Sequence, residues 1–291
     1  MVLKIQGGIG NQLFQYAFLL RLKSTHLKPC ANLDFYNSNM RTHRDAIDLY
    51  QHLELEIFKG LVTPNFISKL YKKIRKTKFH YLAYLLNERY GNVITEQQEF
   101  GFRKILLKRH LDGVVLDGYF ADYRYLKDGL EEVKVAFEQL TKGIEISYNQ
   151  HVAVHIRRGD YINIMRSGEK SNVLDINYYR RCLDQINNKD LVLRIYTDDY
   201  GWAKSVFPVL FEGYTFDFSP EEYTDLDSIW TMSKHQYLIG ANSTFSLWAY
   251  YFGMQHMNKF YFPLEWASSI QNKGYKLFSD DFNNVELVRE Y

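Results

Sequence analysis

The chain has 291 residues, of which 46% are hydrophobic and 24% charged, a balance typical of a globular protein and not of a disordered or fibrous one. This length is enough for two domains, each with its own hydrophobic core, and two is the number we expect. The formal net charge of +2 provides no chain-wide field for nucleic acid, so we expect no nucleic-acid partner.

The cysteines and the first ten residues indicate the cellular compartment in which the protein is expected. The two cysteines, Cys30 and Cys182, lack the paired spacing of zinc sites and redox pairs, which favours a reducing environment. Residues 1–10 lack the basic start and apolar run of a signal peptide, and no stretch is long and apolar enough to span a bilayer. We therefore expect a cytoplasmic protein.

The first half of the chain begins with a strand, a glycine turn and a helix. Residues 2–6 predict the strand, and apolar residues at helical spacing after Gly10 predict the helix. Residues 65–90 are helical and basic, and we interpret them as an insertion. Their basic side chains are Lys69, Lys72, Lys73, Arg75, Lys76 and Lys78. Such a segment is either a merely solvated helix face or a contact with an anionic surface, near which each basic residue contributes about 1 kcal/mol.

The second half alternates strands with helices. Its strands are predicted over residues 151–156, 191–197, 236–240 and 259–262, and its helices over 177–186, 200–207 and 243–252. Before this half, a further strand is predicted over residues 114–120 and a helix over 125–140. This alternation predicts a parallel sheet covered on both faces. We place a domain boundary between residues 145 and 146, where the periodic pattern is interrupted.

The glycine turn, residues 7–12, is the first candidate site. Glycines let the backbone approach a ligand closely, and the following helix offers unpaired N–H groups. The spacing matches neither the dinucleotide fingerprint nor the phosphate loop of nucleotide hydrolases. A plain tight turn is the alternative.

Charged residues follow the strand over 151–156. Arg157, Arg158 and Asp160 come where ligands bind in parallel α/β sheets, at the carboxyl end of a strand. Arginine matches phosphate oxygens with its planar donor fork. The alternative is a surface ion pair between Asp160 and one of the arginines.

Two further strands end in polar groups. Asp198 has a carboxylate suited to the edge of guanine, and it is followed by Asp199, which is typical of a helix N-cap. Residues 242–246 open a helix whose N–H groups and dipole favour phosphate, although Asn242 or Ser243 as a simple cap is the alternative.

Together these motifs resemble the bacterial α-1,2-fucosyltransferases of glycosyltransferase family eleven. Members carry a Gly-Gly-x-Gly-Asn-Gln start, a His-x-Arg-Arg-Gly-Asp strand end and an Asn-Ser-Thr-Phe-Ser helix start, which here are residues 7–12, 155–160 and 242–246. The resemblance implies an α/β fold of the GT-B type, with two Rossmann-like domains facing a cleft. Residues 1–145 would form the acceptor-side domain and residues 146–291 the GDP-fucose-binding domain.

The resemblance also implies roles for single residues. Arg157 would contact the β-phosphate, with Ser243 and Thr244 at the helix N-terminus sharing its charge. The other donor-binding residues would be His155 and Asp198 at the guanosine, together with Arg158 and Asn242. Gly10, Asn11 and Gln12 would face the fucose and the acceptor.

The implied reaction is an inverting transfer of L-fucose from GDP-β-L-fucose to the 2-hydroxyl of a β-galactoside, in the synthesis of an O-antigen or a similar surface glycan. Arginine and a helix end replace a divalent cation, so we expect no metal and no cofactor. Asp160 is our candidate general base, although it could equally serve only to orient an arginine. The α-1,6-fucosyltransferases carry a glutamate where this chain has Met165, so the base does not transfer by motif.

The resemblance also implies an oligosaccharide acceptor carried on a lipid. We therefore expect the basic segment to make a peripheral contact with an anionic membrane, at the inner face of the cytoplasmic membrane. A related transferase that uses another GDP-deoxysugar or forms another linkage stays open, as does a non-catalytic sugar-binding module.

Overall fold

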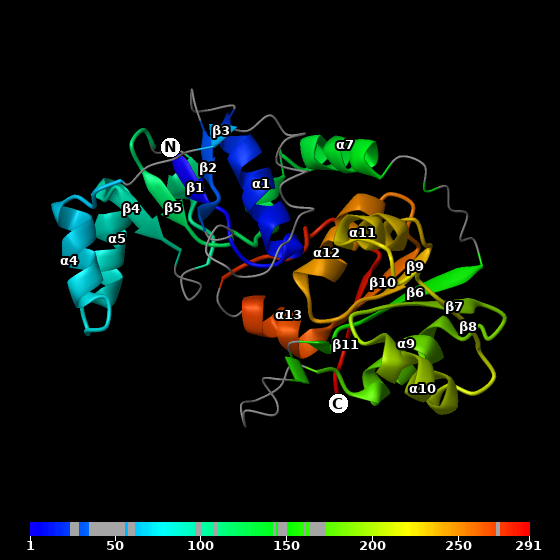
Figure 1. The fold of residues 1–291 in the computed structure, drawn as a ribbon. Coiled ribbons are helices and arrows are strands. Elements are labelled where there is room, and N and C mark those ends of the chain that lie inside the picture. Colours follow the sequence, from blue (N-terminus) through cyan, green and yellow to red (C-terminus); the bar gives the residue numbers. More distant parts are fainter. Residues whose placement is uncertain are drawn as a thin grey trace. The chain divides into compact units, whose positions relative to one another are not determined.

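The computed structural model describes residues 1–23, 29–34, 56–57, 62–96, 101–107, 110–127, 129–141, 144, 150–159, 161–162, 173–271 and 274–291. The chain divides into two compact units (Figure 1). The first unit comprises residues 1–136 and 273–276, and the second comprises residues 137–272 and 277–291. The predicted boundary between residues 145 and 146 falls beside residues outside the described part, and it stays a prediction.

The first unit is built on a five-stranded sheet in the order β3-β2-β1-β5-β4. All its strand pairs are parallel. The strands are β1 (Val2–Lys4), β2 (Cys30–Asn32), β3 (Glu56–Ile57), β4 (Val93–Thr95) and β5 (Val115–Asp117). The helices are α1 (Ile9–Lys23), α4 (Phe66–Ile74), α5 (His80–Tyr90), the 3-10 helix η2 (Lys104–Leu107) and α6 (Tyr123–Leu126), while α7 (Leu130–Leu140) leads into the second unit.

Helix α1 carries much of the first unit's core. The apolar residues that predicted it, among them Leu13, Phe14 and Phe18, are fully buried. Phe18 also packs against Phe120 and Tyr125, with ring centroids 4.5 Å and 4.8 Å away. This burial fixes α1, and with it the glycine turn at its start, against the sheet.

The basic segment predicted to be helical forms two helices, α4 and α5, joined by a turn. Asn65 caps α4, since its side chain accepts a hydrogen bond of 2.9 Å from the backbone N–H of Ser68. The pair lies beside β4, at the edge of the first sheet (Figure 1).

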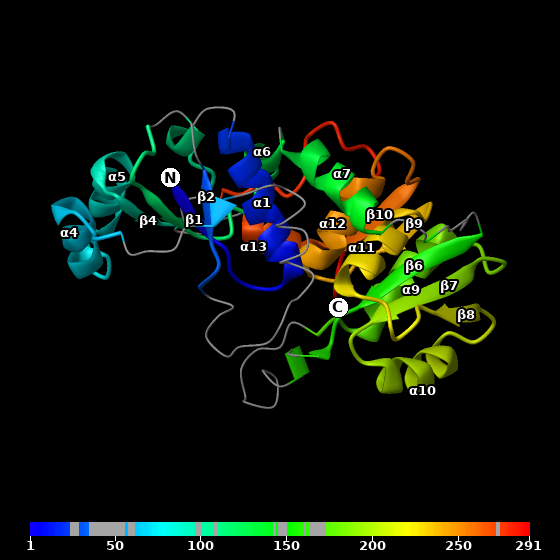
Figure 2. The same ribbon diagram turned by 45° about the horizontal axis from the view of Figure 1, so that its top comes forward.

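The second unit contains a six-stranded sheet in the order β11-β10-β9-β6-β7-β8, again with parallel pairs throughout (Figure 2). Its strands are β6 (His151–Ile156), β7 (Val192–Thr197), β8 (Thr215–Phe218), β9 (Tyr237–Ile239), β10 (Lys259–Pro263) and β11 (Val285–Val288). Its helices are α9 (Ile176–Ile186), α10 (Tyr200–Leu210), α11 (Asp225–Ser233), α12 (Thr244–Gly253) and α13 (Leu264–Gln271).

Helices cover both faces of this second sheet, as predicted. On one face, Val152, Val154 and Ile156 of β6 join a core that also contains Tyr179 of α9 and Phe207 of α10. On the other face lie α11 and α12 (Figure 1). Helix α12 is buried along almost its whole length, which is why its sequence is apolar on every side.

A short segment late in the chain belongs to the first unit. Lys276 accepts a backbone hydrogen bond of 2.8 Å from Tyr123 and donates one of 2.7 Å to the carboxylate of Asp122. The hydroxyl of Tyr275 donates to Glu96 at 2.6 Å. The first unit is therefore completed by residues that follow most of the second unit in sequence.

The predicted class, α/β with two Rossmann-like domains of the GT-B type, is confirmed by these two parallel sheets with their helices. Nowhere in the described ranges is there a helix with the length and apolar character required to traverse a lipid bilayer.

Candidate active site

The polar residues predicted at three strand ends lie along one edge of the second sheet. Strands β9, β6 and β7 are neighbours and run parallel, so their carboxyl ends share that edge. The residues that follow the three strands are Arg157–Gly159, Asp198–Asp199 and Gly240–Ser243. The sheet thus brings together the predicted donor-binding residues of this unit.

Asp198 joins the end of β7 to the loop after β6. Its Oδ2 is 2.7 Å from Nη1 of Arg157, and its Oδ1 accepts hydrogen bonds of 2.8 Å and 3.1 Å from the backbone N–H groups of Arg158 and Gly159. A Cβ added at Gly159 would lie 2.7 Å from Oδ2 of Asp198, so a side chain at this position would displace that carboxylate oxygen. The partner considered for the arginines, Asp160, lies outside the described residues.

Arg158 has partners of its own. Its Nε donates to Oδ2 of Asp199 at 3.1 Å, and its guanidinium lies 3.8 Å from the ring centroid of Trp202. Asp199 also caps α10 by accepting a hydrogen bond of 3.2 Å from the backbone N–H of Trp202, which confirms the predicted cap. Arg158 is consequently more enclosed than Arg157, whose side chain is 35% exposed.

His155 is buried beneath this edge. Its Nδ1 lies 2.6 Å from Oγ of Ser246, which in turn accepts a hydrogen bond of 3.0 Å from the backbone N–H of Ala241. Burial lowers the pKa of His155 to about 4, although the nearby charge of Asp198 acts in the opposite direction. His155 is therefore neutral at pH 7 and links β6 to the start of α12.

The start of α12 lies beside the loop after β6. Ser243 is the N-cap, since its Oγ accepts a hydrogen bond of 3.2 Å from the backbone N–H of Phe245. The hydroxyl of Tyr161 donates to the backbone carbonyl of Asn242 at 3.2 Å. The predicted cap at Ser243 is confirmed, and Thr244 is the first residue of the helix. The predicted contact of Ser243 and Thr244 with phosphate stays a prediction.

Sequence reasoning missed three features of this edge. Ser246 and Trp202 were not assigned, although Ser246 lies within the quoted motif. In addition, the triplet Asp225-Leu226-Asp227 has the Asp-x-Asp spacing of many metal-binding glycosyltransferases, which was overlooked. Asp227 forms a capping box with Thr224 at the start of α11. Burial lowers the pKa of His155, and the charge of Asp225 acts against that lowering.

The predicted acceptor-side residues lie in the first unit, at the carboxyl end of β1. Gly7 has a φ of +87°, which requires glycine, and a Cβ there would lie 3.1 Å from the ring of Tyr119. Gly10 and Asn11 are in the first turn of α1. Gln12 is fully buried, and its Nε2 donates to the carbonyl of Gly7 at 2.9 Å. Gln12 therefore holds the glycine turn in this structure, and its contact with a sugar stays a prediction.

Glu96 organises the loop that lies against this turn. Its Oε2 accepts hydrogen bonds of 2.8 Å and 2.9 Å from the backbone N–H groups of Tyr119 and Phe120, and Phe120 has the unusual φ of 52°. Such backbone strain is found preferentially at functional sites. Burial raises the pKa of Glu96, while the hydrogen bond from Tyr275 and those from Phe120 and Tyr119 lower it. Sequence reasoning did not single out Glu96.

No group of three or more histidine, cysteine, aspartate or glutamate side chains that could hold a metal ion is found among the residues that the structure describes. The arginines and the start of α12 are groups suited to a diphosphate. Metal independence and the role of Asp160 remain predictions.

The carboxyl edge of a parallel sheet is where α/β proteins bind their ligands, and in this chain that edge carries arginines and the start of a helix. The family model for glycosyl transferase family 11 matches residues 116–261, half of the chain, and includes all three strand ends of this edge. The chain belongs to glycosyltransferase family 11, as the motifs indicated, and is a glycosyltransferase.

Curated relatives are distant but cover most of the chain. The O-antigen biosynthesis glycosyltransferase WbnK of Escherichia coli is 25% identical over 97% of this chain and 99% of its own length. An alpha-1,2-colitosyltransferase of Escherichia coli is 25% identical over 85% of this chain and 86% of its own length. Galactoside 2-alpha-L-fucosyltransferase Sec1 of Mus musculus is 24% identical over 86% of this chain and 63% of its own length.

Proposed function

We propose that this chain transfers L-fucose from GDP-β-L-fucose to the 2-hydroxyl of a β-galactoside, with inversion, during the synthesis of an O-antigen or a similar surface glycan. The observation that carries the donor part is the Arg157–Asp198 pair at the carboxyl edge of the second sheet, beside the start of α12. Relatives named for O-antigen synthesis and for 2-fucosyl transfer support the reaction.

The proposed chemistry depends on charge that appears during bond breaking. As the bond from fucose to the β-phosphate breaks, negative charge grows on the diphosphate and positive charge on the sugar ring. Arg157, with its exposed planar fork, and the backbone N–H groups at the start of α12 stabilise that negative charge. Asp198 holds Arg157 in place before the donor arrives.

In this proposal Asp198 and His155 lie near the guanosine. Arg158, which packs against Trp202, lines the same donor-binding pocket. The acceptor binds at the glycine turn around Gly10 and Asn11. Asp160 removes the proton from the attacking hydroxyl.

A second donor is favoured by one observation, the relative named for colitosyl transfer, which is as similar to this chain as the others. Colitose and fucose donors would use the same nucleotide pocket, so the residues at the second sheet do not distinguish them. The difference would lie in the residues that face the deoxysugar.

The test is to incubate the purified protein with GDP-fucose or GDP-colitose and an array of β-galactosides, and to determine the linkage of the product by NMR. We expect an α-1,2-fucosylated galactoside. Transfer of colitose alone would support the second donor, and GDP binding without transfer to any acceptor would contradict both.

We also propose that the reaction needs no metal ion, because arginine and the helix start supply the positive charge at the diphosphate. Turnover should therefore persist in excess EDTA. Loss of turnover that magnesium or manganese restores would contradict this, and would direct attention to Asp225 and Asp227.

A further inference from the structure

Large hydrophobic side chains are exposed mainly on the hairpin formed by α4 and α5. Of the eleven such side chains in the described part of the chain, seven lie between residues 66 and 90. They are Phe66, Leu70, Phe79, Tyr81, Leu82, Leu86 and Tyr90. Contiguous apolar surface of this kind marks an interaction site.

The inner side of the hairpin is fixed to the first sheet. Oγ of Ser68 accepts hydrogen bonds of 3.0 Å and 3.1 Å from the backbone N–H groups of Asn92 and Val93, and Asn87 donates to the carbonyl of Val93 at 3.1 Å. Glu88, the one acidic residue between 65 and 90, is buried and paired with Arg103 at 2.8 Å. The hairpin is thus held in a defined orientation on the first unit.

The outer side carries the apolar residues in two stripes. Phe66, Leu70 and Lys73 recur at helical spacing on α4, and Leu82, Leu86 and Arg89 do so on α5. Each stripe has two exposed apolar residues followed by one basic residue. Such an arrangement is typical of helices that lie in the interface of a bilayer.

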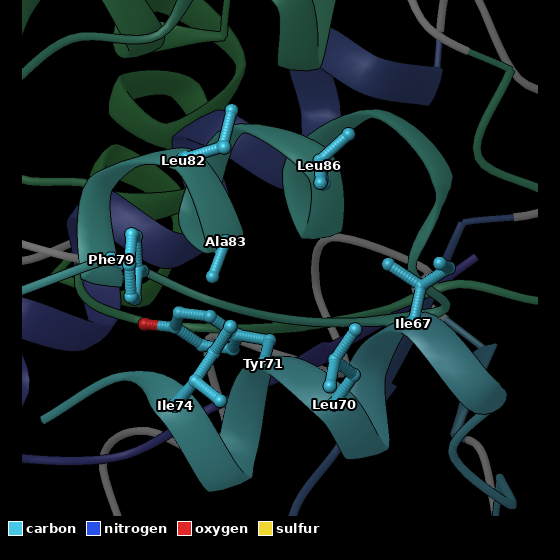
Figure 3. A pocket seen from close by; sticks show the side chains of 8 residues that line it. All are labelled: Ile67, Leu70, Tyr71, Ile74, Phe79, Leu82, Ala83 and Leu86. Carbon is cyan, nitrogen blue, oxygen red and sulfur yellow. The ribbon is translucent and has the colours of Figure 1, made fainter. Parts of the chain in front are cut away.

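An apolar groove separates the two helices. Its volume is about 320 Å³, and Figure 3 shows its lining side chains, which come from both helices and the turn between them. The lining comprises Ile67, Leu70, Tyr71, Ile74, Phe79, Leu82, Ala83 and Leu86, none of which carries a charge. A volume of this size can hold part of a hydrocarbon chain.

The charges around the apolar surface are of one sign. Six basic residues lie between 69 and 78, and all six are exposed. Their long side chains keep the charged ends in water while their stems lie along apolar surface. An anionic headgroup layer over an apolar interior matches this combination, whereas a protein partner would require an acidic rim around an apolar centre of the same shape.

We propose that the outer side of the α4–α5 hairpin docks on an anionic lipid bilayer. Phe79, Leu82 and Leu86 enter the acyl layer, a lipid chain occupies the groove, and the basic residues contact the phosphate groups. This inference goes beyond the proposed function, and its tests use neither donor nor acceptor.

The first test is co-sedimentation of the full chain with vesicles of phosphatidylglycerol and phosphatidylcholine, compared with phosphatidylcholine alone. We expect binding to the anionic vesicles that weakens as salt is raised. Each basic residue removed should weaken binding about fivefold. The variant Lys73→Glu with Lys76→Glu should therefore bind far more weakly than Lys23→Glu with Lys189→Glu, which changes exposed lysines elsewhere by the same charge. Equal binding to neutral and anionic vesicles, or equal loss in the two variants, would overturn the proposal.

The second test measures insertion. The four tryptophans all lie in the second unit, so Leu82→Trp places a new fluorophore on the hairpin. Its emission should shift to shorter wavelength with anionic vesicles and be quenched by brominated acyl chains. Val209→Trp, at an exposed position of α10, is the control and should not respond. If the tryptophan at position 82 stays in water on vesicles that bind the protein, the hairpin is not the docking surface. If the protein binds no anionic vesicles even at low salt, the proposal fails and a protein partner becomes the better explanation for the apolar face.

Discussion

At the scale of single residues, the two adjacent arginines differ in what surrounds them. Arg157 pairs with Asp198 and keeps a third of its side chain exposed, whereas Arg158 lies against Trp202. Arg157→Lys keeps the charge but loses the planar fork. We expect kcat to fall by about 100- to 1000-fold, the effect of removing one donor that stabilises a developing anion.

Arg158→Lys is the matched control for that experiment. Because its contacts are with Asp199 and Trp202, it should lower stability modestly and turnover far less than Arg157→Lys. Near-normal kcat in a stably folded Arg157→Lys variant would show that the β-phosphate binds elsewhere.

Asp198 gives a second prediction at this scale. A carboxylate that contacts only guanine would raise KM when removed and leave kcat unchanged. Here the same carboxylate also holds Arg157 and two backbone N–H groups, so Asp198→Ala should lower kcat as well as raise KM. Asp198→Asn keeps an oxygen that can accept the backbone hydrogen bonds, so its kcat and KM should lie between those of the unchanged protein and those of Asp198→Ala. An effect on KM alone, measured by steady-state kinetics, would separate Asp198 from the positioning of Arg157.

At the scale of elements, β6 and α12 are joined through one buried serine. Ser246→Ala leaves the Ala241 N–H and His155 without their shared partner, and an unsatisfied buried group costs about 1 to 3 kcal/mol. We expect a loss of that size in urea unfolding followed by tryptophan fluorescence, since the four tryptophans report on the second unit. Ser205→Ala, on the exposed side of α10, should change stability little. Equal effects of the two variants on the free energy of unfolding would mean that the hydrogen bonds of Ser246 to His155 and Ala241 do not stabilise the fold.

The elements of the second unit were largely predictable, because buried parallel strands leave continuous apolar runs. β6 was predicted with its observed bounds and β7 to within one residue. β8 was missed because a four-residue, half-buried edge strand has too short a pattern. α11 was missed although Thr224 and Asp227 form a capping box that is visible in the sequence.

The candidate site was predictable as a place but not as a set of contacts. Parallel strands necessarily gather their carboxyl ends, so polar residues at three strand ends predict one cluster. Which carboxylate faces which arginine depends on side-chain packing across the sheet. Nothing in the sequence indicated Asp198 as the partner of Arg157, which is the pair that the structure shows. Glu96 shows the same limit, because its partners lie 23 to 179 residues away.

At the scale of the whole molecule, two buried histidines predict how stability depends on pH. Burial lowers the pKa of His155 to about 4 and that of His235 to about 3, against about 6.5 in an unfolded chain. As pH falls below 6.5, the unfolded chain binds protons that the folded chain does not, so the free energy of unfolding decreases. The loss approaches about 1.4 kcal/mol per pH unit for each histidine and continues until pH reaches the folded pKa.

Urea unfolding between pH 7 and pH 5 should therefore show a decreasing midpoint, with little change above pH 7. His155→Gln removes one of the two groups and should flatten the slope in this range. A midpoint that stays constant from pH 7 to pH 5 would contradict the burial of these neutral rings.

The segment 274–276 has a consequence for the order in which the protein assembles during synthesis. The carboxylates of Glu96 and Asp122 accept hydrogen bonds from Tyr275 and Lys276, respectively. These two donors leave the ribosome only after the strands up to β10 have been made. A nascent chain that ends after residue 136 holds α1 and the five strands of the first sheet but lacks one hydrogen-bond donor to each of these two carboxylates. The unit that is translated first is thus completed only after most of the second unit has been translated.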